Sequence, residues 1–295
     1  MLRSMWTCLL VWSLLCVACL GESSLLRTTR GAPDDLEIEF TGSPIAGVRF
    51  VRLRDLLALP QTTATVFKDE NLFRLPPGGV TVQGVMLDVL AARLGITEKD
   101  YWIEAICNDK YDAPFPREYI QTHKPILVLR VNGISPRAWA LQTGHYDPGD
   151  YLVAYDRFVP AFRALSHEDR QQVPSWIVRL KFDATAEVIA TIAPRGRDAM
   201  DAKVVAAGRI AQQNCLRCHN SGSYGGTKAQ RSWTTLGNVA SRDPVRFAAY
   251  VHTPKNVDSR AKMPPNPQYD EETLTALARY FAAFATEDTS GKGVH

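Results

Sequence analysis

The chain has 295 residues, of which 45% are hydrophobic and 22% are charged, the composition of an ordinary globular protein. A single hydrophobic core stops growing at about 250 to 300 residues, so this length predicts two domains. The formal net charge is only +3, and the sequence has no run of Lys and Arg with interleaved aromatic residues. Both features exclude nucleic acid as an expected partner.

The first 21 residues are typical of a secretory signal peptide. Arg3 gives a short basic start, Gly21 ends the segment, and the stretch 5–20 (MWTCLLVWSLLCVACL) is almost wholly apolar. A stretch this short favours a cleaved leader over a membrane-spanning helix. Two alternatives stay open, an uncleaved leader that anchors the chain and a lipid on Cys19. We therefore expect an exported, periplasmic protein that touches a membrane only under one of these alternatives.

The distribution of the six cysteines argues against a disulfide framework. Three lie in the leader, Cys215 and Cys218 belong to one short motif, and Cys107 stands apart. An exported chain that relied on disulfides would carry several pairs at regular spacing. We therefore expect Cys107 to be a single buried thiol.

The region 33–195, called the front domain below, is predicted to be a mixed α+β domain. Alternating or β-branched patterns predict strands, and apolar patterns closed by Pro or Gly predict short helices. The segment 22–32 (ESSLLRTTRGA) has no clear period and is predicted to be a linker. Strands are expected at 36–40, 47–53, 62–67, 101–107, 125–131, 176–182 and 186–192, and helices at 54–59 and 85–94.

The pattern changes near Asp198, where strand candidates stop. The region 198–286, called the C-terminal domain below, is predicted to be all-α, with helices over 201–214, 245–252 and 271–284. The tail 287–295 is polar and rich in small residues, and it is predicted to be disordered.

The sequence Cys215-Leu216-Arg217-Cys218-His219 has the spacing of a covalent c-type haem attachment motif. Two thiols can bond to the two vinyl groups of one macrocycle only if they lie on one short turn, and the next residue then presents an imidazole to the iron. A zinc site would need two more ligands at suitable spacing, and a redox dithiol would follow a strand, not a helix. We therefore expect one covalent haem c on Cys215 and Cys218, with His219 as an axial ligand.

The order of features over 198–286 resembles that of class I cytochrome c. A helix leads into Cys215, and further helices, a Met263-Pro264-Pro265 loop and a last helix with Tyr280 follow. In that family the Met-Pro loop supplies the sixth iron ligand, which here would be Met263. An aromatic residue of the last helix packs on a glycine of the first in that family, here Tyr280 on Gly208.

Two consequences follow from this resemblance. With His219 and Met263 both bound, the iron would have no open position, which suits electron transfer better than oxygen chemistry. The family often has a proline after the haem His, whose carbonyl orients the imidazole, but the loop 220–228 contains none. Another backbone carbonyl is therefore expected to accept that bond, for which the segment near Gly225-Gly226 is one candidate among several.

The front domain resembles the molybdopterin-binding domain of the sulfite-oxidase family. The shared order is a Leu-Pro helix (VRLRDLLALPQTTATV), a second helix (GVMLDVLAARLGI), an aromatic-rich strand with an Asp-x-Tyr turn, and a strand closed by Asn132-Gly133. That family binds its metal through a cysteine placed between the first two of these features. The interval 67–83 has no cysteine, and Cys107 comes a strand too late. The resemblance therefore implies the fold without a protein thiolate for molybdenum, and molybdopterin is not expected.

Isolated polar residues of the front domain form no catalytic pattern. Asp109 and Asp112 lie in a predicted turn, where Asp is favoured for backbone reasons. The histidines His123, His145 and His167 are scattered along the chain and are expected to be surface or helix-capping residues.

Three hypotheses of function remain. In the favoured one, the chain is an exported cytochrome and not an enzyme. It exchanges one electron with a periplasmic or membrane-bound redox protein, while a cofactor-free front domain docks that partner or binds a small ligand. In the second, the front domain holds a molybdopterin-type cofactor, oxidises a small substrate and passes electrons to the cytochrome. In the third, the chain is a haem-based redox sensor.

Overall fold

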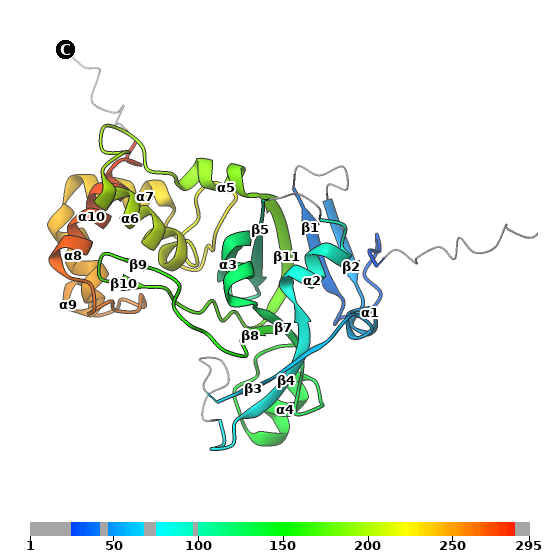
Figure 1. The fold of residues 1–295 in the computed structure, drawn as a ribbon. Helices are drawn as coiled ribbons and strands as arrows, with labels where there is room; N and C mark the ends of the chain where they lie inside the picture. Colours follow the sequence, from blue (N-terminus) through cyan, green and yellow to red (C-terminus); the bar gives the residue numbers. More distant parts are fainter. Residues whose placement is uncertain (1–24, 42–46, 68–74, 97–99, 287–295) are drawn as a thin grey trace, which may run out of the picture.

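The computed structural model describes residues 25–41, 47–67, 75–96 and 100–286 (Figure 1). The expected leader 1–21, the expected tail 287–295 and the start of the expected linker 22–32 lie outside these ranges. Strands occur only up to Ala184, and helices occupy the described chain from Ala202 onward. The expected mixed α+β front domain and all-α C-terminal domain are therefore confirmed. Within the described ranges, no helix has the length and apolar character needed to cross a membrane.

A mixed five-stranded sheet with the order β2-β1-β11-β5-β6 forms the centre of the front domain. Strand β1 pairs in parallel with β11, whereas the other neighbouring strands are antiparallel. In β1 every second side chain points into the core, as a strand with one buried face requires. The strands are β1 (Leu36–Phe40), β2 (Gly47–Val51), β5 (Tyr101–Cys107), β6 (Asp112–Pro116) and β11 (Ile177–Ala184).

A second, antiparallel sheet has the order β3-β4-β7-β8, and β9 and β10 form a short separate ribbon. Four short helices connect these strands, and the apolar faces of the strands and helices form the front-domain core. The strands are β3 (Thr62–Val66), β4 (Val80–Met86), β7 (Ile126–Val131), β8 (Leu152–Ala154), β9 (Arg163–Ala164) and β10 (His167–Glu168). The helices are α1 (Leu53–Leu57), α2 (Leu87–Arg93), α3 (Arg117–His123) and α4 (Pro136–Thr143).

The helices of the C-terminal domain gather on one side of the molecule (Figure 1). Four of them begin at a side-chain cap, supplied by Asp201, Ser232, Asp243 and Asp270, which satisfies free N–H groups of the first turn. The elements are α6 (Ala202–Ile210), the π-helical turn η1 (Ala211–Cys215), α7 (Trp233–Arg242), α8 (Pro244–His252), α9 (Pro254–Val257) and α10 (Glu271–Ala282).

The contact between the first and last helices of this domain is tight. A Cβ atom added to Gly208 would lie 3.1 Å from Cε2 of Tyr280, closer than an ordinary van der Waals contact, so α6 and α10 pack tightly at this glycine. The Tyr280 hydroxyl donates a hydrogen bond of 2.5 Å to the carbonyl of Ile192. The expected packing of Tyr280 on Gly208 is confirmed.

One predicted strand is wrong. Residues 186–192 lie in helix α5 (Thr185–Ile192), where Val188 and Ile192 are buried four positions apart on one helical face. The β-branched residues of this segment favoured a strand, but packing on β5 and β11 and in the apolar cluster of Val188 and Ile192 decides its structure. The predicted helix 85–94 is also shorter than expected, because β4 continues to Met86 before α2 begins.

Candidate functional site

The motif from Cys215 to His219 follows directly on a distorted helix. Helix α6 passes into η1, which ends at Cys215, and single-turn π-helices of this kind are often found at functional sites. The backbone N–H groups of Cys218 and His219 both donate to the Cys215 carbonyl, at 3.1 and 3.0 Å. Both thiols are free and partly buried. The structure therefore brings the two sulfur-bearing residues onto one turn, as attachment to a single macrocycle requires.

The environment of the thiols does not suit a redox dithiol. Burial raises the pKa of Cys215 to about 12, and burial also raises the pKa of Cys218. Redox-active dithiols depend on a lowered thiol pKa. Among the residues that the structure describes, no group of three His, Cys, Asp or Glu side chains is placed to hold a metal ion.

His219 is oriented by a backbone carbonyl. The residue is 9% exposed, and Nδ1 of its ring donates a hydrogen bond of 2.8 Å to the carbonyl of Arg231. Because a carbonyl only accepts, the proton is on Nδ1, and Nε2 keeps the lone pair that an iron ligand needs. Burial lowers the pKa of His219, which favours the neutral ring. The expected backbone carbonyl is therefore that of Arg231 and not one near Gly225-Gly226, because the loop returns to the ring just before α7.

Met263 lies in the loop between α9 and α10. Its side chain is half-buried and packs on the same apolar cluster as Cys215. The side-chain amide of Asn266 holds this loop, because it donates a hydrogen bond of 3.1 Å to the carbonyl of Val251. Oδ1 of Asn266 accepts a hydrogen bond of 3.0 Å from Asn214, the residue before Cys215. The structure thus ties the methionine loop to the motif.

These residues fit a covalent haem. Cys215 and Cys218 would hold the macrocycle, and the Nε2 atom of His219 and the thioether of Met263 would ligate the iron. Sequence reasoning named all four, but it gave no sign of Asn214 and Asn266. Their mutual hydrogen bond depends on two segments that meet only in the fold.

The motif is docked on the edge strand of the front sheet. The backbone N–H of Asp112 donates a hydrogen bond of 3.0 Å to the carbonyl of Arg217, which lies between the two motif cysteines. The Arg217 guanidinium donates a hydrogen bond of 3.1 Å to the hydroxyl of Tyr111. Asp109 stabilises the predicted turn by accepting from the N–H of Tyr111 at 3.1 Å. The Asp-x-Tyr turn therefore contacts the C-terminal domain.

Two glycines permit this docking. A Cβ atom on Gly226 would collide with the carbonyl oxygen of Arg217 and would lie 2.8 Å from that of Lys110. Gly225 has a φ of +82°. Its N–H donates a hydrogen bond of 2.6 Å to Oε1 of Glu104 on β5. Glu104 is 1% exposed, and burial raises its pKa to about 8 in spite of the nearby Lys181. A largely protonated acid therefore holds this loop at neutral pH.

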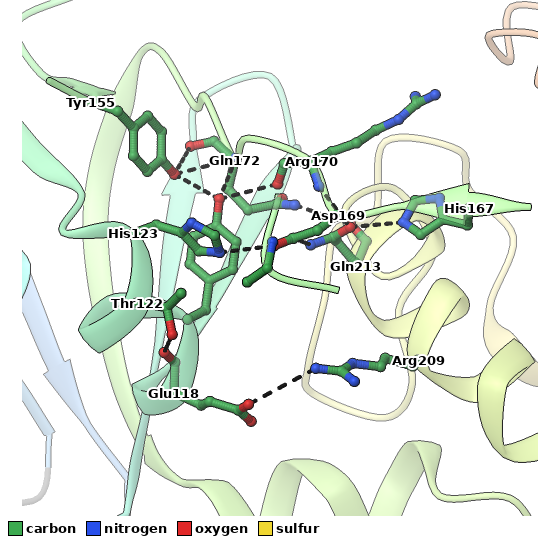
Figure 2. A network of polar contacts seen from close by, with 12 residues as sticks. Glu118, Thr122, His123, Tyr155, His167, Asp169, Arg170, Gln172, Arg209 and Gln213 are labelled. Atoms are coloured by element: carbon green, nitrogen blue, oxygen red, sulfur yellow. Dashed lines mark hydrogen bonds and ion pairs between the residues drawn. The ribbon is translucent and has the colours of Figure 1, made fainter. Parts of the chain in front are cut away.

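A second contact between the two domains is made by the side chain of Gln213 (Figure 2). Its Oε1 accepts from Nε2 of His167 at 2.8 Å and from the backbone N–H of Arg170 at 3.1 Å. Nε2 of Gln213 donates a hydrogen bond of 2.6 Å to Oδ1 of Asp169. The other carboxylate oxygen of Asp169 lies 2.9 Å from Nε2 of His123. One glutamine from η1 thus holds a loop of the front domain.

The expectation that these histidines are surface or capping residues is wrong for two of the three. His167 is 0% and His123 is 6% exposed, and burial lowers the pKa of both. His167 also accepts, at Nδ1, a hydrogen bond of 2.9 Å from the hydroxyl of Tyr269. Only His145 follows a helix end, where its N–H bonds the carbonyl of Ala140.

Comparisons with known proteins distinguish the two parts of the chain. Residues 202–281 match the family described as cytochrome c oxidase, cbb3-type, subunit III. The N-terminal part resembles the crystal structure of the sulfane dehydrogenase SoxCD from Paracoccus pantotrophus, with a TM-score of 0.33 and 19% identity. This similarity covers 56% of the present chain and 43% of that chain, so less than half of that structure is represented. No curated protein matches the chain.

Proposed function

We propose that this chain, whose residues 202–281 form a cytochrome c domain, is an exported one-electron carrier. The family implies a covalent haem c and haem-based electron transfer. The observation that carries the proposal is the turn on which Cys215 and Cys218 lie beside a His219 with a free Nε2. In this proposal the two thiols attach the haem, and His219 and Met263 ligate its iron.

The residues of the chain have separate tasks in this function. When bound, the haem supplies reversible one-electron chemistry. The Arg231 carbonyl keeps the proton of His219 on Nδ1 and fixes the plane of the ring. The Met263 thioether is a neutral ligand that favours the reduced state and a higher potential. The apolar cluster around Cys215 limits the access of water to the site.

The front domain, in this proposal, has no metal of its own and docks a redox partner or binds a small ligand. Cys107 is 4% exposed on β5, and burial raises the pKa of its thiol, so it is a poor source of a metal-binding thiolate. The interval 67–83, where the resembling family places its cysteine, has none. Export is supported by the signal-peptide pattern at 1–21, which lies outside the described residues.

The direct test of the cofactor content is to measure iron and molybdenum in one purified sample. The protein would be made in a host that matures both cofactors. We expect one iron per chain and no molybdenum. Stoichiometric molybdenum would instead make this chain a two-cofactor dehydrogenase, and a sample without iron would refute the electron-carrier proposal.

The axial assignment is tested by Met263→Ala, with Met200→Ala as the matched control because Met200 is 92% exposed. We expect Met263→Ala to lower the reduction potential and to alter the optical spectrum of the haem, and Met200→Ala to change neither. An unchanged potential in Met263→Ala would remove this residue from the site.

A further inference from the structure

The methionine loop, residues 258–270 between α9 and α10, is held at its far end by the front domain. The ribbon of β9 and β10 lies against the C-terminal helices (Figure 1), and β9 contacts α6. In the turn of this ribbon, Oγ of Ser166 accepts a hydrogen bond of 3.1 Å from the backbone N–H of Asp270. The neighbouring hydroxyl, that of Tyr269, donates a hydrogen bond of 2.9 Å to Nδ1 of His167. Two successive residues at the end of the loop are thus bonded to the ribbon.

Asn214 holds the same loop from the side of the haem motif, and its partners fix the orientation of its amide. Its Oδ1 accepts a hydrogen bond from the guanidinium of Arg217, which can only donate. Its Nδ2 therefore carries the two protons, which it donates to Oδ1 of Asn266 and to the hydroxyl of Tyr269, at 3.0 Å each. Asn266 and Tyr269 are 5% and 3% exposed, so little water reaches them to replace a lost partner.

Arg217 is itself held by the front domain. Its guanidinium donates a hydrogen bond of 3.1 Å to the hydroxyl of Tyr111 and lies 5.7 Å from the centroid of that ring. The same guanidinium supplies the proton that Asn214 accepts. Tyr111 therefore fixes Asn214 through one intervening side chain, and the front domain reaches Asn214 from the Asp-x-Tyr turn as well as from the ribbon.

The part of the loop that carries Met263 is too stiff to absorb a shift of Asn266. Only Pro264 and Pro265 separate the two residues, and each proline ring fixes its own φ near about −65°. The backbone N–H of Asn266 donates a hydrogen bond of 3.0 Å to the carbonyl of His252, which fixes Asn266 on the end of α8. A thioether stays near the iron only through the loop that presents it, so a looser loop lowers its effective concentration.

We propose that Tyr111 and His167 of the front domain position the methionine loop, through Asn214 and Tyr269, and thereby set how firmly Met263 is held as an axial ligand. Both act through other side chains and are positioning residues. The inference rests on the axial assignment in the proposed function and deepens it. A partner that displaces the Asp-x-Tyr turn or the ribbon would loosen the thioether, and this loss would lower the reduction potential.

The test is titration of the oxidised, haem-loaded protein with imidazole, followed by the absorption spectrum of the haem. Imidazole can bind this iron only where Met263 gives way, so its dissociation constant measures how firmly the loop is held. Tyr111→Phe removes one hydrogen bond and is expected to tighten imidazole binding about fivefold. Tyr269→Phe breaks the bonds to Asn214 and His167 together, and Asn214→Leu breaks three. Each of these two is expected to tighten imidazole binding about tenfold or more.

Two further variants calibrate the titration. Met263→Ala marks the limit in which no thioether competes, and it should bind imidazole most tightly. Tyr151→Phe is the matched control, because its buried hydroxyl donates a hydrogen bond of 2.5 Å to the carbonyl of Asp34, within the front domain. It removes a tyrosine hydroxyl from the same domain and should leave the imidazole dissociation constant unchanged. Circular dichroism and haem content are measured on every sample.

The possible results separate this inference from the proposed function. If Met263→Ala binds imidazole more tightly but Tyr111→Phe and Tyr269→Phe bind it as Tyr151→Phe does, the inference is refuted and the axial assignment stands. If Met263→Ala binds imidazole no more tightly than the unaltered protein, the axial assignment is wrong and the inference falls with it. Should Asn214→Leu fail to attach haem, the two phenylalanine variants decide. An unaltered protein without covalent haem would refute the electron-carrier proposal itself.

Discussion

The substitution Gln213→Leu tests whether one side chain holds the two domains together. Leucine keeps most of the volume but removes both ends of the amide. Nε2 of His167 and the N–H of Arg170 lose their acceptor, and Oδ1 of Asp169 loses a donor at 2.6 Å. Asp169 keeps its contact with His123. Three groups are thus left without one partner each, two of them on the buried side chains of His167 and Asp169.

The expected loss follows from the cost of unpaired buried groups. Each group that loses its partner costs about 1 to 3 kcal/mol. The costs of groups in one hydrogen-bond network do not add fully, so we expect the free energy of unfolding to fall by about 3 to 5 kcal/mol. Urea unfolding of the haem-loaded protein, followed by circular dichroism, measures this quantity. Gln212→Leu is the matched control. The reasoning would be refuted if Gln213→Leu were as stable as this control.

Three further changes test other parts of the structure. Glu104 has a pKa of about 8 when folded and near 4.5 when unfolded, so its contribution to stability is complete below pH 4.5 and is lost as the pH rises to 8. Glu104→Gln should therefore flatten the decline in unfolding free energy across this window, and an unchanged slope would contradict the assignment. Gly226→Ala places a methyl group against the Arg217 carbonyl and should lower the melting temperature by several degrees, whereas Gly78→Ala, in open space, should not. Ser232→Ala removes the cap of α7 and should lower the free energy of urea unfolding by about 1 kcal/mol, a loss that Ser232→Thr should largely avoid.

The parts of the fold that could be predicted from the sequence are those governed by local patterns. The alternation at 36–40 predicted β1, and the spacing of Cys215, Cys218 and His219 predicted the haem motif because this chemistry requires neighbouring residues. The segment 186–192 was predicted wrongly, because its β-branched residues suit a strand as well as a helix. Packing on β5 and β11, and in the apolar cluster that Val188 and Ile192 share with the C-terminal helices, decides between the two.

The contacts between the domains could not be predicted in this way. Gln213 is an ordinary polar residue near the end of a helix until the loop 161–172 is folded against it. His123 and His167 have no pattern that distinguishes a buried histidine from an exposed one. The carbonyl that orients His219 belongs to Arg231, and its position depends on how the loop 220–231 folds back. Each of these features depends on tertiary structure.

The measurement that tests the central claim most directly is mass spectrometry of the tryptic peptide that contains Cys218 and His219, together with the peptide that ends in Cys215-Leu216-Arg217. The protein would be denatured and extracted with acidified acetone, which removes haem that is not covalently bound. We predict that the two peptides stay joined through one haem, with both thiols blocked. Free thiols on both peptides, with all haem recovered in the extract, would contradict the proposal that this chain is a c-type cytochrome.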